Sequence, residues 1–216
     1  MTELECPSAL FDEAEKPKAL IIFAHGAGAD KSSEFMEHFA QRLTAIQFSV
    51  LRFNFPYMDK RLADGKRRPP DRMPKLIECF ESVLHSVREL NLPIFLMGKS
   101  MGSRVAATMA ETELHNVEGV IALGYPFHPQ KKPENLRLTP IFESKKPMLI
   151  IQGSRDALGN REEITDYDLP EYCQTVFLED GDHDLKPRVK SGFTHQEHIE
   201  SAIRAIEGFF NEHVKN

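Results

Sequence analysis

The sequence predicts an α/β fold in three layers: a minimal, mostly parallel sheet of six strands with helices on both faces. Two observations predict it. Short, continuously apolar runs alternate along the chain with longer segments whose apolar residues recur at helical spacing. The length of 216 residues also suits one α/β domain, and neither a linker nor an internal repeat divides it. We therefore expect a single domain, 1–216, without a separate lid domain.

The expected strands are apolar runs of the kind that parallel strands show when both of their faces are buried. The first run ends in His25-Gly-Ala-Gly-Ala, and the second is stopped by Pro56. Each of the other four runs is also short enough to be a strand. The six runs in chain order are 18–24, 48–55, 93–97, 119–124, 147–152 and 175–178.

Amphipathic segments between these runs predict the helices. Residues 32–45 carry apolar side chains at helical spacing, and a serine at their start is the expected N-cap. Residues 75–90 form the clearest helical pattern, and 103–113 form a helix of small residues suited to close packing. A last helix, with apolar residues on one face from Ile199 to Phe210, closes the chain.

The composition excludes several classes of protein. The 27 Lys and Arg residues against 33 Asp and Glu give a net charge of −6, which disfavours generic binding of nucleic acid. The apolar runs are far shorter than the ~20 residues of a membrane helix, and the acidic start has no secretory pattern. Three cysteines, Cys6, Cys79 and Cys173, without metal-type spacing favour reduced thiols in a cytoplasmic protein. We expect neither nucleic acid nor membrane as a partner, and the oligomeric state stays open.

The segment Gly98-Lys-Ser-Met-Gly102 has the pattern G-x-S-x-G, directly after an expected strand and directly before an expected helix. This is the placement of a nucleophile elbow, a sharp turn that raises a serine hydroxyl above the sheet edge. The following helix N-terminus favours developing negative charge. We therefore predict Ser100 as a nucleophile. The alternative is an ordinary glycine-rich turn with a helix-capping serine.

A nucleophilic serine needs a general base, and the base needs an acid that orients it. In this architecture the chain order is serine, then acid, then histidine. Asp156 follows the fifth expected strand directly, and His183 lies in the loop beyond the sixth, so both order and placement fit. Other acids of these loops are the alternatives to Asp156. They are Asp180, Asp182, Asp184 and, as a displaced acid, Glu162.

Acyl transfer also needs hydrogen-bond donors for the oxyanion of the tetrahedral intermediate. One predicted donor is the backbone N–H of Met101, the residue after the nucleophile. The second is expected from the loop after the first strand, where we favour Ala27, with Gly26 and Gly28 as alternatives. A phosphate-binding turn is disfavoured because neither G-x-G-x-x-G nor G-x-x-x-x-G-K-[ST] occurs.

The other histidines are expected to have structural or surface positions. His25 precedes a glycine at a strand end, where we expect it to shape the turn rather than to act as a base. His195 and His198 belong to the start of the last helix, and we expect both to face solvent.

Five segments carry a family resemblance in their order along the chain. They are HGAGA at 25–29, RFNFPY at 52–57, GKSMGSR at 98–104, GYPFHP at 124–129 and QGSRD at 152–156. Together they resemble the small α/β-hydrolase family. More narrowly, they are similar to its dienelactone-hydrolase-like bacterial branch, related to the testis-expressed and nonspecific-lethal-complex hydrolase-like proteins.

This resemblance implies an α/β-hydrolase fold whose first strands are missing or reduced. It implies Ser100 as nucleophile, His183 as base and Asp156 as orienting acid, and no metal or organic cofactor. We therefore expect a serine hydrolase, carboxylesterase- or thioesterase-like, that cleaves esters or thioesters of small molecules. The alternatives are a catalytically silent interaction module on the same fold and a peptidase or amidase, because the triad types alone do not distinguish these.

Two long segments, 56–74 and 126–146, are expected to be loops, and each follows a strand end where open α/β sheets bind ligands. The first is basic between Lys60 and Arg72. Most charge runs are simply solvated. The functional hypothesis is that Arg67 or Arg68 holds an anionic part of a small ester substrate near the nucleophile.

Overall fold

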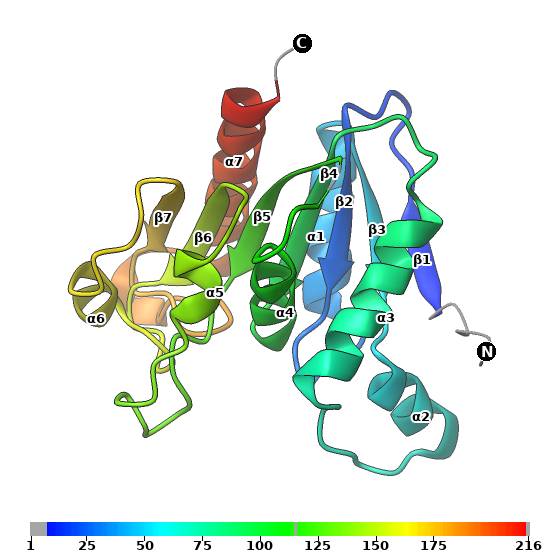
Figure 1. Cartoon of the computed structure of the whole chain (residues 1–216). Helices are drawn as coiled ribbons and strands as arrows, with labels where there is room; N and C mark the ends of the chain where they lie inside the picture. The colour runs from blue at the N-terminus through cyan, green and yellow to red at the C-terminus, as the bar shows by residue number, and fades with distance from the viewer. Residues whose placement is uncertain (1–7, 115, 215–216) are drawn as a thin grey trace.

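A computed structural model describes residues 8–114 and 116–214. The part described contains one sheet of seven strands in the order β1-β3-β2-β4-β5-β6-β7 (Figure 1). All neighbouring strands are parallel except β1, which runs antiparallel to β3. The strands are β1 (Ala9–Asp12), β2 (Ala19–Ala24), β3 (Phe48–Phe53), β4 (Ile94–Lys99), β5 (Val117–Leu123), β6 (Met148–Gly153) and β7 (Cys173–Leu178).

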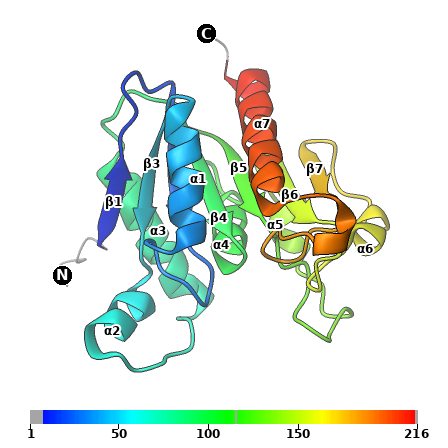
Figure 2. The same cartoon turned by 180° about the vertical axis from the view of Figure 1, so that it is seen from behind.

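Helices cover both faces of this sheet. In Figure 1, α3 and α4 lie in front of it, whereas Figure 2 shows α1 and α7 in front from the opposite side. Each face has its own apolar core, and the parallel strands contribute to both. The helices are α1 (Glu34–Ala45), α2 (Pro56–Asp64), α3 (Met73–Ser86), α4 (Met101–Met109), α5 (Thr139–Phe142), α6 (Arg161–Thr165) and α7 (His195–His213), with a 3₁₀ turn at Val189–Ser191.

The six predicted strands are all present, but the expected number of strands is wrong because the sheet has seven. The missed strand is β1, whose four residues pair with Val50 to Phe53 of β3 at the edge of the sheet. Leu10 and Phe11 of β1 are exposed. An edge strand of this kind needs no continuous apolar run, so the pattern that predicts the buried strands does not detect it.

The expected loop 56–74 is also partly wrong, because it contains α2. Pro56 occupies the first turn, where its missing N–H is tolerated, and Gly65 ends the helix in a left-handed conformation (φ 69°). Tyr57 and Met58 anchor the helix to the core, and its remaining residues are mostly polar. So few buried positions give too weak a period to predict a helix.

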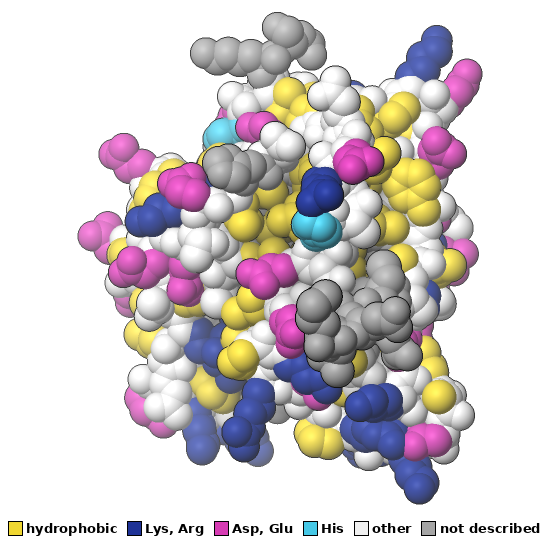
Figure 3. Space-filling model, turned by 45° about the vertical axis from the view of Figure 1, so that its right-hand side comes forward, with side chains coloured by type: hydrophobic (Ala, Val, Ile, Leu, Met, Phe, Trp, Pro, Cys, Tyr) yellow, Lys and Arg dark blue, Asp and Glu magenta, His cyan; other side chains and the backbone are white. Residues whose placement is uncertain are grey.

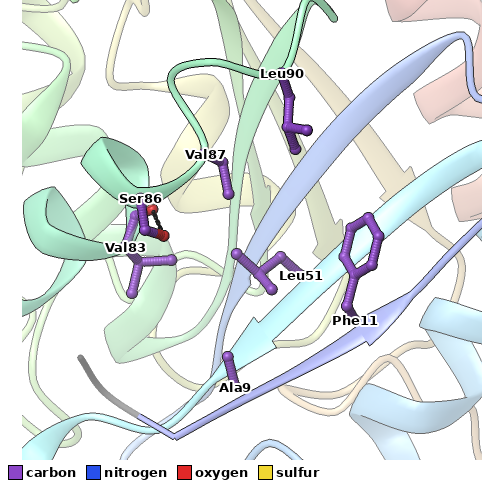
Figure 4. A pocket seen from close by; sticks show the side chains of 7 residues that line it. All are labelled: Ala9, Phe11, Leu51, Val83, Ser86, Val87 and Leu90. Atoms are coloured by element: carbon purple, nitrogen blue, oxygen red, sulfur yellow. Dashed lines mark hydrogen bonds between the residues drawn. The ribbon is translucent and has the colours of Figure 1, made fainter.

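A shallow apolar groove separates β1 from the end of α3 (Figure 4). Phe11, Leu51 and Val87 are among its lining residues, and its lining contains no titratable side chain. It therefore offers no acid or base, and the hydroxyl of Ser86, which also lines it, donates to Val83 O (2.7 Å).

The described part of the chain contains no helix long and apolar enough to cross a membrane. Cys79 and Cys173 are buried, and burial raises the pKa of the Cys173 thiol to about 12, so this side chain is protonated at neutral pH. Cys6 lies outside the described residues.

The edge strand is tied to the sheet by an ion pair. Arg52 of β3 is only 5% exposed and donates two hydrogen bonds to Asp12 of β1, of 2.7 and 2.9 Å, and a third to Lys31 O (2.8 Å).

We expect Asp12→Ala to lower the free energy of unfolding by about 2 kcal/mol, because it leaves a buried guanidinium without its carboxylate. Urea unfolding measures this effect. The double variant Asp12→Leu, Arg52→Met should recover most of the loss, and a single-variant loss under about 0.5 kcal/mol would contradict the argument.

Candidate active site

Ser100 lies between β4 and α4 in a backbone conformation that L-residues rarely adopt, with φ 52° and ψ −113°. Close packing at two glycines surrounds this turn. A Cβ at Gly98 would lie 2.1 Å from the carbonyl carbon of Gly102, and a Cβ at Gly102 would lie 2.5 Å from Ala24 O. Neither position admits a larger residue, which explains the glycines of the G-x-S-x-G segment. Such a conformation costs about 1–3 kcal/mol and is found most often at functional sites.

Three side chains form one hydrogen-bonded chain. His183 Nε2 lies 2.8 Å from Ser100 Oγ, and His183 Nδ1 lies 2.8 Å from Asp156 Oδ2. The three residues follow β4, β7 and β6, whose carboxyl ends meet at one edge of the sheet (Figure 1). The structure thus brings together the three residues predicted as nucleophile, base and acid.

Asp156 is fully buried, and three hydrogen-bond donors satisfy its carboxylate. Oδ1 accepts from the backbone N–H of Leu158 (2.8 Å), and Oδ2 accepts from Gln152 Nε2 (2.9 Å) and His183 Nδ1–H. The remaining lone pairs of a buried carboxylate must be met in this way, because an unpaired buried charge is costly. With the proton on Nδ1, His183 Nε2 is left to accept from the serine hydroxyl.

Gln152 is a site residue that sequence reasoning missed. The two N–H groups of its amide are shared among Asp156 Oδ2, Tyr125 O (3.2 Å) and Gly159 O (3.0 Å), so it links the carboxylate of Asp156 to two neighbouring loops. The available signal was a polar residue at the end of an otherwise apolar strand, β6. A buried amide at such a place needs several partners.

His183 lies in the loop 179–186, which we name the base loop. This loop packs closely on the end of β6, because a Cβ at Gly153 would lie 2.2 Å from Asp182 O. The Arg155 guanidinium donates to Asp180 O (2.7 Å) and Lys186 O (3.1 Å). These contacts hold the base loop beside Asp156.

A cavity of about 360 Å³ opens beside the hydroxyl of Ser100. The backbone of Gly26, Ala27 and Gly28, from the loop after β2, forms part of its wall. Met101 is the first residue of α4, so its N–H has no acceptor within the helix. The predicted oxyanion donors, Ala27 and Met101, therefore both lie beside Ser100, and their role in catalysis stays a prediction.

Residues 17–211 match the family described as the alpha/beta hydrolase domain, which is nine-tenths of the chain. The chain belongs to this family.

Within the described residues, no three His, Cys, Asp or Glu side chains are grouped as metal ligands would be.

Solved structures of this fold are similar over nearly the whole length of the α/β hydrolase domain. A serine hydrolase homologue from Coxiella burnetii is 18% identical, with a TM-score of 0.69, and the match covers 93% of this chain and 90% of that one. The dienelactone hydrolase of Anabaena variabilis is 16% identical (TM-score 0.69, 96% and 92% covered). A serine hydrolase without lid from Xanthomonas campestris is 17% identical (TM-score 0.70, 96% and 89% covered). At these identities the likeness concerns the fold.

The alternative acids are occupied elsewhere in this α/β hydrolase domain. Asp180 pairs with Arg188, which lowers the pKa of that carboxyl to about 2. Asp182 accepts two backbone N–H groups of its own loop, Asp184 pairs with Lys99 (3.3 Å), and Glu162 is exposed on α6. Among the acids named here, all within the described residues, only Asp156 is hydrogen-bonded to the ring of His183.

Of the buried histidines His25, His128 and His198, two carry a prediction, and one of these two contradicts it. His25 Nδ1 donates to Gly26 O (2.6 Å), and its Nε2 accepts from the backbone N–H of Phe55 (3.1 Å), so it shapes the turn as expected. His198 was expected to face solvent and is only 3% exposed. Its Nδ1 donates to Leu185 O (2.8 Å), which joins α7 to the base loop and explains the burial.

The basic residues after α2 do not line the cavity. Arg68 donates to Asp64 Oδ1 (2.6 Å) and to Lys60 O (3.1 Å), so it folds back onto α2, whereas Arg67 is exposed. Figure 3 shows Lys and Arg side chains at the left and at the right of the lower end of the molecule, and α2 lies at the lower right in Figure 1. A role for Arg67 or Arg68 in binding substrate stays a prediction.

The buried His25 predicts a pH-dependent stability. Desolvation lowers the pKa of His25 from 6.5 to about 4, so between these pH values the unfolded chain binds a proton that the folded chain does not. The free energy of unfolding is therefore highest above pH 6.5 and falls as the pH falls toward 4. Through His25 alone we expect it to be about 2 kcal/mol lower at pH 4.5 than at pH 6.5.

Urea unfolding of the wild type and of His25→Gln at pH 6.5 and at pH 4.5 measures this effect. The variant should be less stable at pH 6.5, but its stability should fall less between the two values. The exposed His85 supplies the control, and His85→Gln should keep the wild-type pH dependence. Equal pH dependence in the wild type and His25→Gln would contradict the argument.

Proposed function

We propose that this protein is a serine hydrolase that cleaves carboxylic esters or thioesters of small molecules through an acyl-enzyme. The observation that carries the proposal is the hydrogen-bonded chain from Asp156 through His183 to Ser100, with two contacts of 2.8 Å. The likeness to a dienelactone hydrolase, whose name gives a lactone as its substrate, supports an ester as the substrate class. The cytoplasmic location expected from the cysteine content is part of the same proposal.

In the first half of the proposed reaction, Ser100 Oγ attacks the carbonyl carbon while His183 Nε2 takes the hydroxyl proton. The buried carboxylate of Asp156 stabilises the imidazolium that forms. The oxyanion accepts hydrogen bonds from the backbone N–H groups of Ala27 and Met101. These hydrogen bonds are strongest in the transition state, where the negative charge on the oxygen develops. The bond from the carbonyl carbon to the leaving oxygen or sulfur then breaks, and His183 returns its proton to that atom.

In the second half, a water molecule attacks the acyl-enzyme. His183 takes a proton from this water, the same two N–H groups hold the second oxyanion, and the bond to Ser100 Oγ breaks with return of the proton to it. The acid product and the free enzyme result. A cavity of about 360 Å³ that opens directly on Ser100 suits a small substrate.

Replacement of the nucleophile tests this proposal. We expect Ser100→Ala to lower kcat on p-nitrophenyl esters by about 10⁴-fold or more, because the members of a triad act as a unit. A fluorophosphonate probe should label the wild type and not the variant. Ser191→Ala is the matched control, because it removes a serine that donates to Arg188 O and does not line the cavity, and it should keep both the esterase activity and the labelling. Full esterase activity in Ser100→Ala, or a folded wild type that is inert to the probe, would overturn the proposal and favour a catalytically silent module.

The hypothesis of an anionic substrate can be tested on the exposed cation Arg67. For esters matched in size, we expect Arg67→Ala to lower kcat/KM of a carboxylate-bearing ester by about threefold and of a neutral ester hardly at all, since solvent screens exposed charges. Arg68→Ala, which removes a cation already paired with Asp64, should have a smaller effect. Initial rates at low and high salt measure this. Equal kcat/KM of the wild type for both esters would remove the hypothesis.

A further inference from the structure

Lys99 is a buried cation directly next to the nucleophile. It is the last residue of β4, it is only 7% exposed, and it forms part of the cavity wall. Burial lowers the pKa of its ammonium group, which reflects the cost of removing this charge from water. A methionine would fill the same space without that cost, so the presence of lysine at this position needs a chemical reason.

The ammonium group of Lys99 is directed at the residue predicted to be the base. Its Nζ donates to the backbone carbonyl of His183 (2.7 Å) and pairs with Asp184 Oδ1 (3.3 Å). The same Nζ lies 5.6 Å from the centroid of the Phe35 ring, on the first turn of α1. Lys99 thus joins the nucleophile turn to the middle of the base loop.

The hydrogen bond from Lys99 Nζ to His183 O passes over the end of the neighbouring strand β5, where a glycine leaves space for it. In the sheet order β4-β5-β6-β7, the end of β5 lies between Lys99 and the loop after β7. The residue there is Gly124, with φ 60°. A Cβ at Gly124 would lie 2.9 Å from His183 O and 3.3 Å from Lys99 Nζ, so any other residue would push on the contact itself.

The ring of His183 needs support because it is partly exposed. Its side chain is 29% exposed, so packing alone does not fix it between Ser100 and Asp156. Other contacts hold the ends of the base loop: Arg155 binds Asp180 O, and His198 binds Leu185 O. Lys99 donates the hydrogen bond that holds the backbone of His183 itself.

We propose that Lys99 is a positioning residue that fixes the backbone of His183 by hydrogen bonding, so that the imidazole stays in reach of both Ser100 and Asp156. This inference rests on the proposed function. It assigns to the second residue of the G-x-S-x-G segment a role in orienting the base.

Lys99→Met is the first test, because it keeps the length of the side chain and removes the donor. We expect kcat on p-nitrophenyl esters to fall by about 30-fold or more while KM changes by less than about threefold, since substrate binding is largely kept. We also expect the melting temperature to stay equal or rise, because a buried charge is removed. Loss of activity with gain of stability separates positioning from a merely structural role.

The matched control is Lys18→Met. Lys18 also combines an ion pair, with Glu207 (2.9 Å), and a ring contact, 4.6 Å from the centroid of Phe48. It directly precedes β2, at the opposite end of that strand from the cavity. This variant should keep the wild-type kcat.

Chemical rescue then separates the hydrogen bond from the charge. Lys99→Ala removes a fragment equivalent to propylammonium, and we expect added propylammonium to raise kcat of this variant by about tenfold. Tetramethylammonium carries the same charge without a donor and should give no rescue. In proton NMR, the far-downfield signal of the His183–Asp156 hydrogen bond should weaken in Lys99→Met and return in Lys99→Arg.

Each outcome decides the inference. A kcat of Lys99→Met within threefold of the wild type, a parallel loss of stability with no rescue by propylammonium, or equal rescue by tetramethylammonium would overturn it. The labelling of Ser100 is read in the same samples. A wild type that is inert to the fluorophosphonate probe removes the proposed function, whereas a labelled and active wild type with an active Lys99→Met removes only the role of Lys99.

Discussion

The close approach of the β4–α4 turn to the end of β2 is the constraint on which the site depends. Because no atom larger than hydrogen fits at Gly98 or Gly102, the chain turns sharply at Ser100 and holds that residue at φ 52°. The turn directs the hydroxyl toward the carboxyl edge of the sheet, where the segments after β6 and β7 also end. A parallel sheet therefore does more than supply a core. It brings three residues from distant parts of the sequence within hydrogen-bonding distance.

A second constraint is the burial of Asp156. A fully buried carboxylate persists only where its lone pairs are met, and here two amide donors and an imidazole meet them. The same bonds fix the direction of the carboxylate and therefore the tautomer of His183. The bonds that satisfy the charge of Asp156 are thus the same bonds that orient His183, and Gln152 contributes one of them.

The parts of this fold that the sequence predicts are those with strong local patterns. Ser100 and Asp156 follow strands that are buried throughout, and His183 follows the half-buried β7. A short apolar run predicts each of these strands without knowledge of its neighbours. The strand β1 and the helix α2 escape detection because few of their residues are buried. Gln152 and His198 escape for another reason: their burial follows from tertiary contacts, of Gln152 with Tyr125 O and of His198 with the base loop. Contacts of that kind leave no period in the local sequence.

The polar residues inside this protein are concentrated at one edge of the sheet. His25, Lys99, Gln152 and Asp156 are all buried at or just beyond the carboxyl ends of parallel strands, whereas Ala19–Ala24 and the first residues of β4 and β6 are apolar. A fold selected only for stability would place apolar side chains at such positions, since well-packed apolar groups are as stable as buried ion pairs or more so. The strained backbone at Ser100 adds to this cost at the same edge. Stability is thus given up where the candidate site lies, and the apolar cores on the two faces of the sheet offset the loss.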